Sequence, residues 1–293
     1  MLNAVIYERL SKFRLQMRFK ANQNTAGNRK SSQKGSSTEF SDFREYQPGD
    51  DVRRIDWNAY ARTERLFIKE YAEEKETVLT ILVDTSASMD FGEKNKAELA
   101  KDLVEALSYL ALTGGDRVVL VDLKHPGRPF PVSGGRKMIV KAREWIDDLT
   151  FSGTVDVSES VRKLEPSTVG ITVLVSDFLE EDLIDQSEMA RMGKALAYLK
   201  YKKQQVYLLQ ILCEEELRTD LVGTYYFIDS EDGSKLRVTM DNESITAYEN
   251  ALNAFLAGIQ KTAKGSGANY ILVDGGKDLE KILFEDLKKI YEL

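Results

Sequence analysis

The chain has 293 residues, of which 42% are hydrophobic and 30% charged, a balance typical of globular proteins and unlike that of disordered chains. This length allows one large domain or two ordinary ones with a substantial core. No apolar run approaches the roughly 18 residues of a membrane span, and the charges scattered through the first twenty residues do not fit a secretory signal. The single cysteine, Cys213, excludes an internal disulfide and favours a reducing compartment, so we expect a cytoplasmic protein.

The residue counts also exclude two common kinds of site. One histidine and one cysteine are too few for a typical zinc centre built from protein ligands alone. The phosphate-binding loop of the common nucleotide hydrolases, G-x-x-x-x-G-K-[ST], does not occur in the sequence.

Positive charge is concentrated at the start of the chain. The first 38 residues contain eight basic residues and one acid, a net charge of +7, whereas the whole chain carries −7. We predict a basic N-terminal helix that packs Val5, Ile6, Leu10 and Phe13 on the body, followed by a flexible loop up to residue 38. Binding to an acidic protein, an anionic lipid surface or nucleic acid stays open as an alternative. The loop has no aromatic residue, so nucleic acid is not expected, and any membrane contact would be peripheral.

A regular alternation of strands and helices begins at residue 77. Short apolar runs predict strands covered on both faces, and apolar residues at helical spacing predict amphipathic helices. The expected strands are Val78–Val83, Val118–Leu123, Arg128–Val132 at a sheet edge, Ile171–Val175, Val206–Leu212 and Asn269–Val273. The expected helices are Lys96–Leu112, Lys137–Leu149, Val157–Leu164, Glu188–Lys200, Ser244–Lys264 with Ser244 as its cap, and Leu279–Tyr291. This order predicts an α/β fold with a doubly wound, mostly parallel sheet and helices on both faces.

Two further segments accompany this main domain of residues 77–293. Thr224–Asp229 and Lys235–Thr239, separated by turn-forming residues, predict a β-hairpin inserted at about 222–240. Residues 39–76 are dense in paired charges and aromatic residues, and we expect them to form a charged extension packed on the main domain.

Hydroxyl and carboxylate side chains follow two of the predicted strands. Asp84, Ser86 and Ser88 form a D-x-S-x-S string directly after the first strand, Thr154 lies in a later loop, and Asp177 follows the strand Ile171–Val175. Ligands collect beyond the carboxyl ends of strands in such sheets. Ligands that are all oxygen atoms predict a hard divalent cation. We expect Mg²⁺, with Mn²⁺ or Ca²⁺ as alternatives. Two carboxylates leave such an ion able to accept a further carboxylate from another molecule.

The D-x-S-x-S string, the later Gly-Thr loop and the Asp after a strand resemble the metal-ion-dependent adhesion site of von Willebrand factor A domains. Asp84, Ser86 and Ser88 match its first motif, Thr154 its second and Asp177 its third. The resemblance implies a metal-bridged protein-binding module without chemistry of its own, so no catalytic residue is expected.

The block upstream of the main domain narrows the resemblance. Residues 39–46 (EFSDFREY), 49–57 (GDDVRRIDW) and 61–62 (AR) are similar to the signature of a bacterial von Willebrand A-like group catalogued as domain of unknown function fifty-eight. Members of this group are typically encoded beside AAA+ ATPases of the MoxR type. The resemblance therefore implies an adaptor or chaperone partner of such an ATPase, binding the ATPase or its client.

Several charged and aromatic residues have more than one interpretation. Asp50, Asp51, Arg53 and Arg54 are candidates for a partner-binding surface, but opposite charges this close in sequence also fit an ion-pair network together with Asp56. We expect Trp57 to be a packing anchor. His125 precedes Pro-Gly in an exposed turn, and Cys213 has no evident base partner, so neither is expected to be catalytic.

Three functions follow from these observations. The first is a non-enzymatic, Mg²⁺-dependent interaction module. The second is a Mg²⁺-dependent phosphotransferase or phosphatase with Asp84 as nucleophile, although Ser86 stands where such enzymes often have a second carboxylate and no lysine is evident near the site. The third is an electrostatic tether through the basic N-terminal segment.

Overall fold

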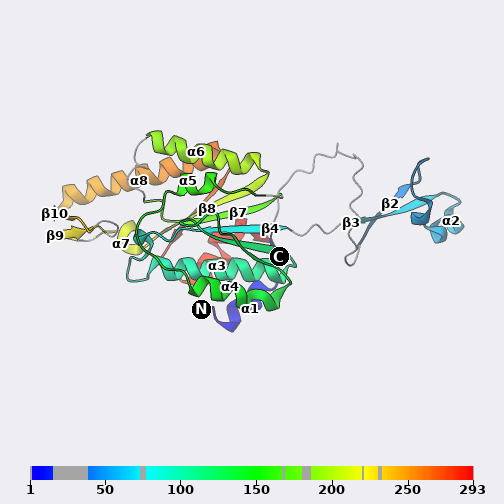
Figure 1. Cartoon of the computed structure of the whole chain (residues 1–293), viewed down its shortest axis with the longest axis horizontal. Helices are drawn as coiled ribbons and strands as arrows, with labels where there is room; N and C mark the ends of the chain where they lie inside the picture. Colours follow the sequence, from blue (N-terminus) through cyan, green and yellow to red (C-terminus); the bar gives the residue numbers. More distant parts are fainter. Residues whose placement is uncertain are drawn as a thin grey trace. The chain divides into compact units, whose positions relative to one another are not determined.

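The computed structural model describes residues 2–15, 39–72, 77–166, 169–179, 186–219, 221–229 and 233–292. Contacts within the chain divide it into two units (Figure 1). The main unit joins Met1–Phe19 to Thr77–Leu293, and the small unit is Lys20–Glu76. Among the described residues, no helix combines the length and the apolar character needed to cross a membrane.

A six-stranded sheet forms the centre of the main unit, in the order β11-β8-β7-β4-β5-β6. Its strands are β4 (Val78–Val83), β5 (Arg117–Asp122), β6 (Phe130–Val132), β7 (Gly170–Ser176), β8 (Gln204–Leu212) and β11 (Asn269–Asp274). The first five strands of this order are parallel, and β6 is an antiparallel edge strand. Every residue of β7 and β8 is buried, as their apolar runs require in a sheet covered on both faces. Pro129 and Pro131 restrict their segment to the edge, because proline cannot donate to a central ladder.

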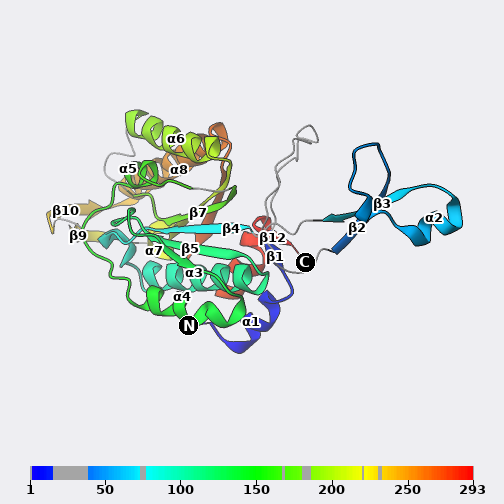
Figure 2. The ribbon, with the colours of Figure 1, turned by 45° about the vertical axis from the view of Figure 1, so that its right-hand side comes forward.

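Helices cover both faces of the sheet, so the predicted fold class is confirmed (Figures 1 and 2). One face packs on α1 (Ala4–Leu10), α3 (Lys96–Thr113), α4 (Ile139–Asp147) and α9 (Leu279–Phe284). The other face packs on α5 (Val157–Arg162), α6 (Gln186–Tyr201) and α8 (Asn242–Gly265). Strand residues alternate between the two cores, with Ile81 in the first and Leu82 in the second.

The N-terminal helix α1 belongs to the main core. Ile6 and Leu10 are buried there as predicted, but Val5 is 58% exposed, which corrects its assignment to the packed face. The Tyr7 hydroxyl donates to the carboxylate of Glu105, and Arg143 pairs with that carboxylate as well. Strand β1 (Arg14–Leu15) then pairs antiparallel with β12 (Tyr291–Glu292) at the other end of the chain.

Two helix boundaries differ from the sequence-based expectation. The closing helix ends at Phe284, and a 3₁₀ turn over Asp286–Lys289 leads into β12, because the chain end pairs with β1 and buries Ile290 and Tyr291. Helix α8 begins at Asn242, and its cap is Asp241, which accepts from the backbone N–H of Ser244. A carboxylate is a strong N-cap acceptor, so Ser244 lies inside the first turn.

The predicted hairpin insertion is confirmed. Strands β9 (Gly223–Ile228) and β10 (Lys235–Met240) pair antiparallel with each other and form a sheet of their own. They follow the short helix α7 (Glu214–Leu217), which starts just after β8 ends. The hairpin therefore projects beyond the carboxyl edge of the main sheet (Figure 1).

The small unit consists of β2 (Glu39–Glu45), a 3₁₀ turn over Val52–Arg54, α2 (Trp57–Thr63) and β3 (Phe67–Ala72), with β2 and β3 antiparallel. Ile55 and Ile68 are its buried apolar side chains among those described. Trp57 is 60% exposed and meets Tyr60 edge to face, so it does not anchor the core of this unit, contrary to expectation. Packing of residues 39–76 on the main domain stays a prediction.

Candidate metal site

The D-x-S-x-S segment and Asp177 lie at the same edge of the sheet. Asp84 directly follows β4 and Asp177 directly follows β7, and the two strands pair in register from Val78 to Val83. The backbone N–H of Asp84 extends this ladder by donating to the carbonyl of Val175 at 2.9 Å. The topology therefore places both carboxylates at neighbouring strand ends, as the sequence predicts.

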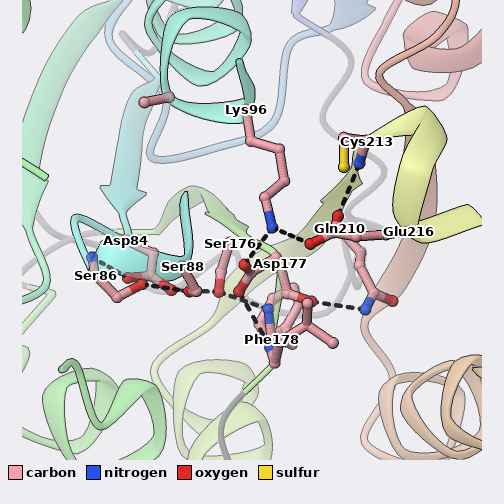
Figure 3. A network of polar contacts seen from close by, with 12 residues as sticks. Asp84, Ser86, Ser88, Lys96, Ser176, Asp177, Phe178, Gln210, Cys213 and Glu216 are labelled. Carbon is pink, nitrogen blue, oxygen red and sulfur yellow. Dashed lines mark hydrogen bonds and ion pairs between the residues drawn. The ribbon is translucent and has the colours of Figure 1, made fainter. Parts of the chain in front are cut away.

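Short polar contacts connect the side chains in this segment (Figure 3). The backbone N–H of Ser86 donates to Oδ1 of Asp84 at 2.9 Å, and the Ser176 hydroxyl donates to Oδ2 of Asp84 at 2.5 Å. The Ser86 and Ser88 hydroxyls are 3.0 Å apart. Both oxygens of Asp84 are thus oriented by the chain itself, and Ser176 is a contributor that the sequence analysis missed, although it stands next to Asp177.

The loop that contains Thr154 is held at this edge of the sheet by backbone hydrogen bonds of its neighbours. The carbonyl of Gly153 accepts from the backbone N–H of Ala87 at 2.8 Å, and the carbonyl of Thr85 accepts from the backbone N–H of Ser152 at 2.9 Å. These bonds hold the loop beside the D-x-S-x-S segment. Thr154 itself is exposed. The structure therefore brings Asp84, Ser86, Ser88 and Asp177 to one edge of the sheet, where Ser88 is half-buried and the other three are buried, and it places Thr154 on the solvent side.

Burial and mutual repulsion act on the two carboxylates. Burial, and then the nearby charge of Asp177, raises the pKa of Asp84 to about 6, although hydrogen bonds from Ser176 and Ser86 oppose the rise. Both aspartates are almost fully buried. A cation at this edge would therefore relieve an unfavourable concentration of negative charge.

A buried lysine lies next to Asp177, which corrects the expectation that no lysine is near the site. Lys96 is 0% exposed, and its ammonium contacts Oδ2 of Asp177 at 2.7 Å and Oε1 of Glu216 at 2.6 Å. Burial lowers the pKa of Lys96, but the two carboxylates outweigh this effect and raise it above its ordinary value. The available signal was the position of Lys96 as the first residue of α3, one residue after its cap Asn95.

Two further side chains hold the backbone at Asp177. Nε2 of Gln210 donates to the carbonyl of Asp177 at 2.8 Å, and Oε1 of Gln210 accepts from the Tyr270 hydroxyl at 2.7 Å. Oδ1 of Asp177 accepts from the backbone N–H of Leu179 at 3.1 Å. The position of this carboxylate is therefore defined by β7, β8 and β11 together.

The donor set fits a hard divalent cation. Within the described ranges, no three His, Cys, Asp or Glu side chains form a metal-binding group, so an ion here would depend on hydroxyl ligands. Asp84 and Asp177 offer carboxylates, and Ser86, Ser88 and Thr154 offer hydroxyls, without nitrogen or sulfur. Asp84, Asp177 and Glu216 contribute three carboxylates to this network, and Lys96, which contacts Asp177 and Glu216, contributes one ammonium. Excess negative charge is therefore left for an ion.

The candidate partner-binding residues lie in the small unit, away from this network in sequence. Asp50 accepts from Arg44 at 2.9 Å, and this contact, with a backbone hydrogen bond from Gln47, lowers the pKa of Asp50. Asp51 caps the 3₁₀ turn by accepting from the backbone N–H of Arg53, and Arg53 is exposed. The Arg54 side chain lies outside the described residues. The two acids thus have local structural roles, and a docking role for this surface stays a prediction.

Asp56 has a similar role to Asp51. It is buried and caps α2 by accepting from the backbone N–H groups of Asn58 and Ala59. Asp51 and Asp56 thus satisfy backbone donors at the starts of their helices, and Asp50 pairs with Arg44, while the wider ion-pair network stays a prediction.

The structure places His125 in an exposed turn, as expected, and buries Cys213. Nδ1 of His125 is 2.8 Å from Oδ2 of Asp122, and the imidazole is exposed in a turn. Cys213 is buried behind the α7 turn, where its backbone N–H donates to Glu216.

Cys213 should be chemically inert in the folded protein. Burial, and then the charge of Glu216, raises the pKa of its thiol to about 12, so almost no thiolate exists at pH 8. We expect a colourimetric disulfide reagent at pH 8 to label Cys213 only after denaturant is added. Rapid labelling of the native protein would contradict this prediction.

Comparison with known proteins finds relatives of this chain in two mycobacteria. It is 26% identical over 252 residues to an uncharacterized protein of Mycobacterium tuberculosis, covering 83% of this chain and 77% of that one, and an uncharacterized protein of Mycobacterium bovis matches to the same extent. Solved structures with similar folds include an aerotolerance-related membrane protein from Bacteroides fragilis, with 19% identity, a TM-score of 0.42, and coverage of 73% of this chain and 99% of that one.

Two more solved structures are similar at this level. BatB from Bacteroides thetaiotaomicron has 17% identity, a TM-score of 0.44, and coverage of 73% and 98% of the two chains. The pilus adhesin SpaC from Lactobacillus rhamnosus GG has 13% identity, a TM-score of 0.45, and coverage of 75% and 31%. A family model described as "Protein of unknown function DUF58" matches residues 42–254. The chain therefore belongs to the DUF58 family, as its signature block in residues 39–62 predicts.

Proposed function

We propose that this protein is a cytoplasmic, non-enzymatic interaction module that binds a carboxylate of a partner through Mg²⁺ at the carboxyl edge of the main sheet. The partner suggested by the family resemblance is a MoxR-type AAA+ ATPase or its client. The observation that carries the proposal is the donor set: two buried carboxylates and three hydroxyls, with excess negative charge and oxygen ligands alone.

The candidate ligands would contribute to ion binding in different ways. Asp84 and Asp177 would supply charge, while Ser86, Ser88 and Thr154 would supply neutral oxygens; the bound ion would offer a coordination position to the partner. Ser176 and the backbone N–H of Ser86 hold Asp84 in one orientation before any ion arrives. Such preorganisation lowers the cost of assembling the ligands. The exposed Thr154 marks the side from which a partner would approach.

The phosphotransferase alternative fits the geometry less well. A nucleophilic carboxylate needs an accessible oxygen, but Asp84 is buried and both of its oxygens accept hydrogen bonds. Lys96 lies at this edge of the sheet, but its ammonium is engaged by Asp177 and Glu216. The electrostatic tether would use residues 1–34, of which residues 16–34 lie outside the described part of the chain.

Partner binding should depend on both the ion and Asp84. With the full chain immobilised, we expect a purified MoxR-type ATPase to bind in excess Mg²⁺ and to be released by EDTA. Asp84→Ala should reduce binding at least tenfold, because it removes a charged ligand of the ion. The measurement is equilibrium binding by biolayer interferometry.

A matched control separates the site from general charge effects. Asp147→Ala removes an exposed acid of α4, and binding should be unchanged. An ATPase that binds equally well in EDTA and to Asp84→Ala would refute the metal-bridged mechanism. Turnover of a phosphate ester that Asp84→Asn abolishes would instead favour the enzymatic alternative.

A further inference from the structure

Lys96 is a fully buried cation at the edge of the candidate site. Its side chain has no exposed surface, and its ammonium lies between Oδ2 of Asp177 and Oε1 of Glu216 at 2.7 and 2.6 Å (Figure 3). Three elements meet at this point: the first turn of α3, the end of β7 and the short helix α7. Burying a lysine is costly, and structural reinforcement alone does not require a charge.

The ammonium directly contacts one of the proposed ion ligands. Asp177 uses Oδ2 for Lys96 and Oδ1 for the backbone N–H of Leu179. A divalent ion held by Asp177 and Asp84 would therefore lie close to a second positive charge. Like charges repel strongly where water is excluded, so the lysine must weaken ion binding relative to the same oxygen cage without it.

Glu216 acts in the opposite direction. Its Oε1 shares the Lys96 ammonium, and its Oε2 accepts from the backbone N–H of Cys213 at 2.8 Å, which fixes the carboxylate in place. The Tyr248 hydroxyl donates to the backbone carbonyl of Glu216 at 2.7 Å and holds α7 from the side of α8. Part of the positive charge of Lys96 is thus offset by a group that is not a candidate ion ligand.

We propose that Lys96 sets the affinity of the site for divalent cations, acting as a built-in counter-charge on Asp177 whose effect Glu216 limits. This inference rests on the proposed function, because it concerns the same ion site. With Lys96 present, the empty cage carries less net negative charge. A carboxylate brought by a partner then supplies attraction for the ion that the chain lacks, so ion binding and partner binding reinforce each other.

Substitutions at the two ends of this contact should shift ion affinity in opposite directions. In calorimetric Mg²⁺ titrations of the full chain at pH 8, where protons compete least with the ion, Lys96→Met should lower the Kd about tenfold. Glu216→Gln should raise the Kd about threefold, because the ammonium then acts on Asp177 alone. A purely structural role for the ion pair would shift both variants the same way, through loss of order at the site.

Two further variants keep the test decisive. Lys96→Gln retains a donor toward Asp177 without the charge, and it should tighten Mg²⁺ binding even if Lys96→Met does not fold. Lys163→Met makes the same lysine-to-methionine substitution in the exposed Lys163–Glu159 pair and should leave the Kd for Mg²⁺ unchanged. Equal affinity in the wild-type, Lys96→Gln and Glu216→Gln proteins would overturn the role of Lys96 while leaving the ion site intact. A wild-type protein that does not bind Mg²⁺ at millimolar concentrations would overturn both proposals.

Discussion

Asp84→Asn should make the protein more stable in EDTA and insensitive to Mg²⁺. The buried carboxylate, whose pKa is raised to about 6 against an ordinary value near 4, is disfavoured in the folded state as pH rises from about 4 to 6 and fully so above that range. Removing its charge should add about 1–2 kcal/mol to the free energy of unfolding at pH 7.5. The gain is not larger because the asparagine makes a less favourable contact with Ser176 than the carboxylate does.

Saturating Mg²⁺ should reverse this order. The wild-type protein should gain about 2.7 kcal/mol at one hundred times the Kd, whereas Asp84→Asn should gain nothing. Urea denaturation of both proteins, each in EDTA and in Mg²⁺, measures the four free energies of unfolding. As a control, Asp147→Asn, which changes an exposed acid, should behave as the wild-type protein does. An Asp84→Asn protein that is less stable in EDTA and still responds to Mg²⁺ would rule out the ligand role of Asp84.

Gly170→Ala, which adds a single methyl group to the sheet, should strongly lower the stability of the protein. Gly170 starts β7 between β4 and β8, where an added Cβ would lie 2.4 Å from the backbone carbonyl oxygen of Val78 and 3.2 Å from Oε1 of Gln204. Val78 is held in the ladder and cannot move aside cheaply. We expect a loss of about 3 kcal/mol in the free energy of unfolding, measured by urea denaturation.

The same substitution elsewhere should have the opposite sign. At Gly193, within α6, an added Cβ would make ordinary contacts of 3.5 Å with Thr262 and 3.6 Å with Ser266. Alanine is the better helix former, so Gly193→Ala should stabilise the protein by about 0.5–1 kcal/mol. A Gly170→Ala protein as stable as wild type would show that β4 and β7 do not pair in the register described here, and a loss of stability in Gly193→Ala would contradict the space seen at that position of α6.

The strands could be predicted from the sequence because burial on both faces leaves a plain pattern. The runs at Val78–Val83 and Gly170–Ser176 are continuously apolar or nearly so, and a parallel sheet requires such runs. The end of the chain could not be predicted in the same way. Two-residue strands such as Arg14–Leu15 have no periodicity, and only their long-range pairing with Tyr291–Glu292 ends the closing helix early.

The candidate site shows the same division. Asp84 and Asp177 could be placed at one edge because each follows a predicted strand, and strand ends gather in a parallel sheet. Lys96 could not, because a lysine in the first turn of a helix ordinarily extends into water. Its burial depends on Asp177 and on Glu216, which lies 120 positions later in the short helix α7.

The small unit is inserted between two segments of the chain that both belong to the main unit. Helix α1 fills the core with Ile6 and Leu10, and β1 pairs with β12, so the polypeptide enters the main body before residue 20 and returns to it at residue 77. A truncated protein beginning at residue 77 would lose a piece of its own interior and expose apolar surface. Genetic dissection of the signature segment therefore calls for excising residues 20–76 and splicing the flanks with a Gly/Ser bridge, as for a nested domain.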